Sequence, residues 1–337
     1  MKLQTLWYLS PDKPKPFWFW CLLPLTGIFY VISATRRVFY DIGLLKAYQC
    51  KAKVVVVGNI SVGGNGKTPL VIRLAKYYKD KGIRTGILSR GYGGSHTKFP
   101  HLLNYSCTAN MVGDEPKLMF DRLGIDVVID PKRARGARYL AEERRCEIII
   151  CDDGLQHYAL KRDQEIVVMD KREVGNGWLL PMGPLREGLW RLDKADALVF
   201  NNHSSDKIRH SDAFNMQLQS NCWVNVMNKE RKSLAEFKNY IKAYFGKVTA
   251  LAGIGDPQRF FDTITTLGIA TDEQIGFVDH HQYTKSDLPC GMLLMTEKDA
   301  VKCVKFASLD HWYLEIEADL PSEFFNRLDP ENMNINQ

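Results

Sequence analysis

The chain has 337 residues, of which 45% are hydrophobic and 25% charged, and its formal net charge is +6. This composition is ordinary for a globular protein, and the length suits one large or two medium domains. The mild positive charge fits anionic partners such as phosphorylated substrates or an anionic lipid surface, but it is equally typical of a solvated basic surface. Because no run of five or six like charges occurs, we expect no nucleic-acid partner.

The cysteines and histidines show no metal-binding spacing. The eight cysteines are scattered and none forms C-x-x-C, which is typical of reduced, buried thiols. The eight histidines include no H-E-x-x-H or similar arrangement. We therefore expect no structural zinc site.

An apolar segment near the N-terminus, FWFWCLLPLTGIFYVISA at residues 17–34, carries no charge and has basic residues on both sides. Its length is at the lower limit for a transmembrane helix, and its aromatic end is typical of the membrane interface. A cleaved signal peptide is disfavoured, because no clear cleavage site is present. A single span would place one basic flank outside the membrane, so a monotopic anchor is favoured. The remaining alternative is a helix that is buried in the core of the protein.

The central part of the chain alternates between apolar strands and amphipathic helices. Strands are predicted at 52–60, 84–89, 125–129, 147–151, 165–169 and 197–200, and helices at 69–80, from Pro116, and at 133–145. Continuous β-branched runs that alternate with helices indicate a doubly wound, mostly parallel α/β sheet.

The pattern changes after residue 208. Short alternating runs at 215–218 and 223–227 predict two exposed strands, and a second α/β set follows with strands at 248–253, 274–278 and 292–296 and helices at 257–267 and from Lys298. The predicted domains are a membrane anchor at 1–36, a P-loop core at 37–208, a two-stranded connector at 209–232 and a smaller α/β domain at 233–337.

The strongest motif follows the first predicted strand. It consists of Ser61, Val62, Gly63, Gly64, Asn65, Gly66, Lys67 and Thr68, and a helix is predicted directly after it. Strand, glycine-rich turn and helix together form a P-loop, whose backbone N–H groups surround phosphate oxygens. Lys67 is expected to contact the β- and γ-phosphates and Thr68 to bind Mg²⁺. The motif departs from the usual pattern in having Ser61 where glycine is common.

A second motif, CDDGLQH, ends the strand at 147–151. A carboxylate at the end of a strand beside the P-loop strand is where P-loop enzymes hold Mg²⁺, so Asp152 or Asp153 is a candidate ligand. Gln156 and His157 either face the phosphates or pack behind them. The alternative for the two aspartates is a helix N-cap with an acidic first turn.

For the other candidate catalytic residues, the sequence spacing alone gives weaker support. Asp114, in Gly-Asp-Glu-Pro, is either a helix N-terminal residue or a carboxylate that takes the proton of an acceptor hydroxyl. His280 follows a strand of the second domain and could pair with a carboxylate of the first, with Asp279 fixing its tautomer, or be a surface histidine. Arg186, in a Pro- and Gly-rich loop, could stabilise transferred charge or lie on a surface loop.

The motifs VVVVGNISVGGNGKTP, SRGYGG, GDEP, DDGLQH, LLPMGPLRE, DHHQY and TEKDAVK occur in this order. Together they resemble the tetraacyldisaccharide 4′-kinase family of Gram-negative bacteria. The resemblance runs from the apolar segment to about Lys302, and the last thirty or so residues match no motif of the family.

The resemblance implies a kinase that phosphorylates the 4′-hydroxyl of tetraacyldisaccharide 1-phosphate, with ATP and Mg²⁺, as a monomer at the cytoplasmic face of the bacterial inner membrane. It implies that Asp114 is the catalytic base and His280 its partner, that Lys67 and Arg186 act on the phosphates, and that Asp152 and Asp153 keep their metal role. It places Gln156, His157, Glu187 and Arg90 around the site. The roles of Arg90 and Lys298 stay unassigned.

Other P-loop classes fit less well. A membrane-cycling partition-type ATPase needs a lysine early in the loop, where this chain has Val62. A GTPase needs D-x-x-G and N-K-x-D, which neither Asp152-Asp153-Gly154 nor Thr296-Glu297-Lys298-Asp299 provides. A non-enzymatic scaffold is hard to reconcile with the Lys67-Thr68 pair.

Overall fold

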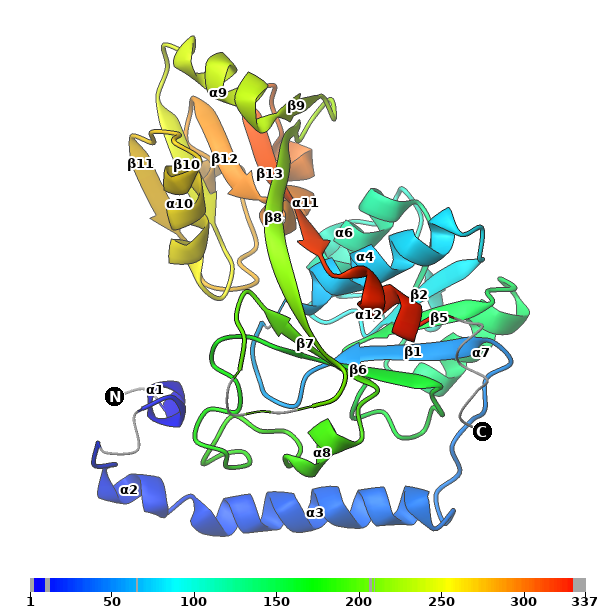
Figure 1. The fold of residues 1–337 in the computed structure, drawn as a ribbon. Coiled ribbons are helices and arrows are strands. Elements are labelled where there is room, and N and C mark those ends of the chain that lie inside the picture. The colour runs from blue at the N-terminus through cyan, green and yellow to red at the C-terminus, as the bar shows by residue number, and fades with distance from the viewer. Residues whose placement is uncertain (1–2, 10–12, 65, 206–207, 209, 330–337) are drawn as a thin grey trace. The chain divides into compact units, whose positions relative to one another are not determined.

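The computed structural model describes residues 3–9, 13–64, 66–205, 208 and 210–329. By their contacts the residues form two compact units (Figure 1). The first unit comprises residues 1–90, 132–217 and 319–337, and the second comprises residues 91–131 and 218–318. Units defined by contacts need not coincide with domains that fold independently, so the domain boundaries given above stay a prediction.

The first unit is built on a parallel sheet. Its strands are β1 (Lys53–Gly58), β2 (Thr85–Ser89), β5 (Ile148–Asp152), β6 (Gln164–Met169) and β7 (Ala197–Asn201). The order across the sheet is β7-β6-β1-β5-β2, and each neighbouring pair is parallel. Every residue of β5 and β6 is buried. This is why both strands are continuous apolar runs rather than alternating ones.

The helices of the first unit are α1 (Leu3–Trp7), α2 (Phe17–Trp20), α3 (Leu23–Asp41), α4 (Lys67–Asp80), α7 (Arg133–Glu142), α8 (Trp190–Asp193) and α12 (Ser322–Arg327). Helix α4 buries Leu70, Leu74 and Tyr78, which recur every four residues and therefore share one face. The doubly wound α/β core predicted from the sequence is confirmed.

Helices α2 and α3 carry the apolar N-terminal segment. Among the described residues, the segment Phe17–Asp41 is the one helix that is long and apolar enough to span a membrane by length and composition. Thr26 is the buried residue of α3, whereas Ile28, Val31 and Ile32 are 56–62% exposed. The alternative of a buried core helix is therefore wrong, because the apolar side chains of α3 do not pack into the protein.

The second unit contains strands β3 (His101–Leu102), β4 (Asp126–Ile129), β9 (Arg231–Ser233), β10 (Val248–Ala252), β11 (Glu273–Gly276), β12 (Met292–Thr296) and β13 (His311–Asp319). Its helices are α5 (Ala109–Val112), α6 (Asp114–Leu123), α9 (Leu234–Lys242), α10 (Pro257–Thr266) and α11 (Glu297–Cys303), with short 3-10 turns at Lys285–Asp287 and Val304–Phe306. Strands β11-β10-β12-β13 are successive parallel neighbours. Trp223, Phe237 and Trp312 lie at the centre of its apolar core.

One expectation about the middle of the chain is wrong. Residues 215–218 and 223–227 do not form two strands, because a single strand, β8 (Ala213–Asn225), covers most of both. The polar stretch between them contains no glycine or proline to end the strand. Strand β9 pairs antiparallel with β8, and the sequence analysis did not predict it.

Helix α9 was also not predicted, although its start is visible in the sequence. Ser233 and Glu236 form a capping box, in which each side chain bonds to the backbone N–H of the other residue. The S-x-x-E spacing is the sequence signal for this helix start.

The start of helix α6 depends on Gly113. Its φ of +96° and ψ of 152° lie in a region that is open almost only to glycine. A Cβ on Gly113 would also lie 2.6 Å from the carbonyl oxygen of Tyr92. The turn at residues 91–94, from the SRGYGG motif, thus lies directly against the residue that precedes Asp114.

We expect Gly113→Ala to lower the free energy of unfolding by about 1–3 kcal/mol, because alanine meets both the strained backbone and the Tyr92 carbonyl. The control is Gly124→Ala at the other end of α6, where φ is +59° but no atom lies within 4 Å of the added Cβ. Denaturant unfolding of both variants checks the prediction. Equal losses would contradict the role of the Tyr92 contact.

Candidate active site

The P-loop of the first unit connects β1 to α4. Gly66, with φ of +88°, precedes Lys67, the first residue of α4. Ser61 is buried and Val62 half-buried, whereas Gly63 and Gly64 are exposed. Asn65 lies outside the described residues. The exposed glycines and the helix start place backbone N–H groups and the positive end of a helix dipole at the same point, as phosphate binding requires.

The loop at residues 181–187 is bonded to the P-loop. The backbone N–H of Val62 donates to the Pro184 carbonyl over 2.9 Å, and the N–H of Arg186 donates to the Ile60 carbonyl over 2.6 Å. These bonds bring the Arg186 guanidinium to the carbonyl of Asn59, 3.0 Å away, and to the Asn59 side chain. Arg186 is therefore part of the P-loop's surroundings and not of a detached surface loop.

Asp153 is the carboxylate that faces these cations. It accepts from Arg186 over 2.9 Å and 3.1 Å, and Lys67 Nζ lies 3.6 Å away. Burial raises the pKa of Asp153, but Lys67 and Arg186 outweigh it and hold the pKa well below its usual range. Asp153 also has a positive φ of 49°, a costly conformation that is common at functional sites.

Asp152 is hydrogen-bonded to residues other than those that contact Asp153. Its carboxylate accepts from Ser89 Oγ over 3.1 Å, and its backbone carbonyl accepts from Arg133 over 3.0 Å. The side chain is 3% exposed. The two aspartates thus have different surroundings, and only Asp153 is ion-paired to the P-loop lysine and Arg186 in the contacts described.

Gln156 and Glu187 lie together beside the P-loop. Gln156 donates to Glu187 over 2.9 Å, and Tyr158 donates to the other oxygen of the same carboxylate. His157 lies next to this pair in sequence. Burial lowers the pKa of His157 to about 4, with a further contribution from Arg133, Arg90 and Arg36. The exposed Arg90 therefore contributes positive charge near this site.

These residues fit a nucleotide with a divalent cation. The glycine turn and helix start suit phosphate oxygens, and Lys67 and Arg186 supply two cations beside them. Thr68 is half-buried in the first turn of α4. Among the described residues no group of three or more His, Cys, Asp or Glu side chains is placed to hold a metal. A magnesium ion in such a site needs only one or two carboxylates, because phosphates and waters complete its shell.

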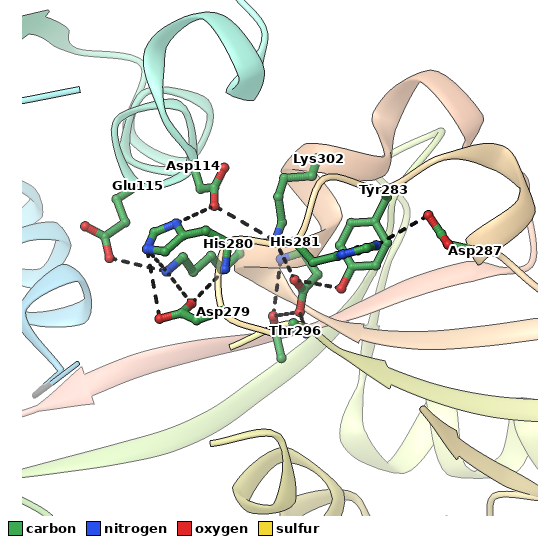
Figure 2. Close-up of polar contacts among 12 residues, drawn as sticks. Asp114, Glu115, Asp279, His280, His281, Tyr283, Asp287, Thr296 and Lys302 are labelled. Atoms are coloured by element: carbon green, nitrogen blue, oxygen red, sulfur yellow. Dashed lines mark hydrogen bonds and ion pairs between the residues drawn. The ribbon is translucent and has the colours of Figure 1, made fainter. Parts of the chain in front are cut away.

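The second cluster of candidate residues lies within the second unit (Figure 2). His280 Nδ1 is 3.0 Å from Asp114 Oδ2, and Lys302 Nζ is 3.9 Å from the same oxygen. Asp114 starts α6 and is 4% exposed, whereas the His280 side chain is 31% exposed. The contact between Asp114 and His280 exists as expected, but both residues belong to one unit.

The second ring nitrogen of His280, Nε2, lies beside Lys298. Lys298 Nζ lies 3.5 Å from His280 Nε2, 3.2 Å from Asp279 and 3.7 Å from Glu115. A carboxylate can only accept and an ammonium can only donate, so these contacts favour the tautomer with the proton on Nδ1. Asp279 Oδ2 is 3.9 Å from Nε2, too far for the tautomer-fixing bond expected of it.

His281 does not take part in this cluster. It stacks on Phe277. Its Nε2 lies 3.4 Å from Asp287 Oδ2 (Figure 2). His280 instead has a left-handed φ of +61°, and its backbone N–H donates to Asp279 over 3.0 Å. The turn at residues 279–281 therefore presents one histidine to Asp114 and the other to the interior of its own loop.

The sequence analysis missed three polar residues of these clusters. Asn59 follows β1 directly and binds Arg186. Arg172 follows β6, which neighbours β1, and its guanidinium is 3.5 Å from the Gly64 carbonyl. Both stand at carboxyl ends of neighbouring parallel strands, and that position is a usable signal. Lys302 is one helical turn from Lys298, a weaker signal.

Comparison with known proteins identifies what the chain is similar to. A family model described as tetraacyldisaccharide-1-P 4′-kinase matches residues 18–332. The similarity therefore continues beyond Lys302, and the expectation that the last thirty or so residues match nothing is wrong. Those residues include strand β13 and helix α12.

Individual relatives give the same result. A tetraacyldisaccharide 4′-kinase of Pseudoalteromonas atlantica is 47% identical over 91% of this chain and 97% of its own length. One of Idiomarina loihiensis is 45% identical over 95% of this chain and 94% of its own length. The crystal structure of LpxK from Aquifex aeolicus in complex with ATP matches with a TM-score of 0.79 and 32% identity, over 93% of this chain and 98% of that one.

The low pKa of His157 predicts a pH dependence of stability. The unfolded chain binds a proton on this histidine near pH 6.5, and the folded protein only near pH 4. The folded state should therefore lose stability as the pH falls from 6.5 towards 4. In His157→Gln this contribution is absent, so the melting temperature should fall less over the same window. Parallel curves for the two proteins would contradict the prediction.

Proposed function

Because the chain belongs to the tetraacyldisaccharide-1-P 4′-kinase family, we propose that it transfers the γ-phosphoryl group of ATP to the 4′-hydroxyl of tetraacyldisaccharide 1-phosphate, a lipid A precursor. The observation that carries the residue-level part of the proposal is the 3.0 Å contact between Asp114 and His280. A buried carboxylate beside a histidine is a suitable acceptor for a hydroxyl proton.

On the nucleotide side, Lys67 and Arg186 act on the phosphates. Both cations are paired to Asp153 in this structure, and phosphate oxygens would replace that carboxylate as their partner. Asp153, Asp152 and the Thr68 hydroxyl are the proposed magnesium ligands. Mg²⁺ held by these residues would supply positive charge that offsets the negative charge developing on the phosphates during transfer.

On the acceptor side, Asp114 takes the proton of the 4′-hydroxyl. The hydroxyl oxygen forms a bond to the γ-phosphorus, the bond to the β-phosphate oxygen breaks, and ADP leaves with the electron pair. His280 and Lys302 both contact Oδ2 of Asp114, so we assign Oδ1 to the incoming proton. The Nδ1–H of His280 fixes the orientation of the carboxylate.

The N-terminal helices anchor the protein to the membrane that holds its substrate. Each buried CH₂ contributes roughly 0.8 kcal/mol, so a lipid with acyl chains does not leave the bilayer readily. Helix α3 exposes Ile28, Val31 and Ile32. We assign the protein to the cytoplasmic face of the inner membrane, because ATP is available there, and we expect a monomer.

The contacts of α3 favour a monotopic anchor over a single span. Near its start, Thr26 Oγ1 accepts from the backbone N–H of Met182 over 3.3 Å. Near its end, Arg37 lies 4.0 Å from the ring of Trp190. Eleven residues of helix correspond to roughly 16 Å. A helix that contacts the folded part of its own unit at both places lies along that part, and a spanning helix would have to leave it.

The proposed reaction is tested with γ-labelled ATP, Mg²⁺ and tetraacyldisaccharide 1-phosphate in detergent. We expect the label on the lipid, a loss of kcat of about 10²–10⁴-fold for Asp114→Asn, and a smaller loss for His280→Gln. Asp121→Asn, on the exposed face of the same helix, should keep the activity of the wild type. Label released only as free phosphate would overturn the kinase assignment in favour of a membrane-cycling ATPase.

Membrane attachment has its own test. Replacing Ile28, Val31 and Ile32 together by serine should lower co-sedimentation with anionic vesicles, since the exposed apolar face of α3 is lost. Leu309→Ser, an exposed apolar residue of the second unit, is the control. Equal binding by the triple variant and the wild type would contradict the assignment of α3 as the anchor.

A further inference from the structure

Helix α11 carries two lysines one turn apart, and both face the acidic start of α6. Lys298 lies 3.7 Å from Glu115, and Lys302 lies 3.9 Å from Asp114. Lys298 Nζ is 3.5 Å from His280 Nε2, whereas Lys302 approaches Asp114 from the side away from the His280 ring (Figure 2). Asp114 is therefore in contact with His280, from the turn at residues 279–281, and with Lys302, from helix α11.

Lys302 is unusually buried for a lysine. Its side chain is 1% exposed, and its ammonium lies 2.8 Å from Asp299 Oδ1 and 4.9 Å from the centre of the Tyr283 ring. Among the described residues the ammonium has no partner with hydrogen-bond geometry. Its contacts with Asp299 and Asp114 are thus mainly coulombic, and in a buried site such contacts are strong.

The simplest alternative is that Lys302 only neutralises Asp299. Asp299 is fully buried, but it has several hydrogen-bond donors of its own. It accepts from the Gly253 N–H over 3.0 Å, from the Tyr283 hydroxyl over 3.1 Å and from the Thr296 hydroxyl over 2.6 Å. Within the described part of the chain, the contacts of Asp114 Oδ2 are those with His280 and Lys302. Asp114 has fewer partners than Asp299, so the charge of Lys302 stabilises the Asp114 carboxylate more.

We propose that Lys302 is a positioning residue for the phosphoryl transfer, held in place by Asp299 and Tyr283 so that its charge orients the buried carboxylate of Asp114 for the acceptor hydroxyl. This inference rests on the proposed function of Asp114. A buried carboxylate needs compensating groups, and a fixed ammonium beside Oδ2 leaves Oδ1 directed to the acceptor hydroxyl.

The proposal predicts which kinetic constant changes. Lys302→Met removes the ammonium that lies 3.9 Å from Asp114 Oδ2 and leaves His280 Nδ1 3.0 Å from the same oxygen. Because the orientation of this carboxylate affects the chemical step and not the binding of the lipid, kcat should fall while KM changes little.

The test compares Lys302→Met, Asp299→Asn and the double variant with the wild type. The assay is labelled transfer from ATP to tetraacyldisaccharide 1-phosphate. We expect Lys302→Met to lose about 10-fold or more in kcat, with KM changed less than about 3-fold. Lys305→Met, an exposed lysine of the same segment, is the matched control.

Asp299→Asn separates the two roles of Lys302. It keeps an amide oxygen that can accept from the ammonium, so Lys302 stays beside Asp114 and kcat should stay within about 3-fold of the wild type. The double variant removes both buried charges, which should restore the melting temperature that Lys302→Met loses but not its kcat at neutral pH. This comparison keeps the proposal testable even if Lys302→Met alone folds poorly.

Three results would overturn the proposal. They are a loss for Lys302→Met that lies in KM and not in kcat, a double variant with wild-type kcat, and an Asp299→Asn variant as inactive as Lys302→Met. Failure of the proposed function itself is a separate outcome, because the wild-type protein would then place no label on the lipid.

Discussion

The buried carboxylate of Asp114 is the constraint around which the polar side chains of the second unit are arranged. An ionised carboxylate that is 4% exposed is costly unless nearby groups compensate its charge. Three segments do so here, namely the helix start that follows Gly113, the turn that carries His280, and helix α11 with Lys302. The conformation of Gly113 and the left-handed φ of His280 then have one explanation, since both place a compensating group against the same carboxylate.

In the first unit, the charge of the Asp153 carboxylate is likewise compensated, but by different groups. Asp153 follows β5 and lies between Lys67 and Arg186, which come from the P-loop and from the loop bonded to it. Here the compensating cations are themselves the groups suited to phosphate. They are therefore held in position by the carboxylate before any phosphate arrives, and little reorganisation is needed when their partner changes. The 38% exposure of the Asp153 side chain is consistent with a partner that can be exchanged.

Much of the fold could be predicted from the sequence because buried parallel strands are continuous apolar runs, as in β1, β5 and β6. The P-loop was equally clear, since its glycines and Lys67 stand between such a strand and a helix. Periodicity gave no indication that β8 continues through a polar stretch, because its pairing with neighbouring strands decides this. Nor could spacing bring Lys302 to Asp114, because the two are far apart in the chain and meet only through packing of α11 on α6. The resemblance to a family supplied the Asp114–His280 pair, which spacing alone left open.

The two carboxylates also show how environment separates chemical roles. Asp153, whose pKa is held low by two cations, would be a poor proton acceptor but a good ligand for a metal ion. Asp114 has one imidazole and one ammonium against a single oxygen, so its other oxygen is left for an incoming proton. Lys302 Nζ lies 3.9 Å from Asp114 Oδ2, so it offsets the charge of the carboxylate without the close hydrogen-bonded pair that Asp153 forms with Arg186. Asp299 and Tyr283 hold the lysine at this position, and Asp114 Oδ1 stays available to the acceptor hydroxyl.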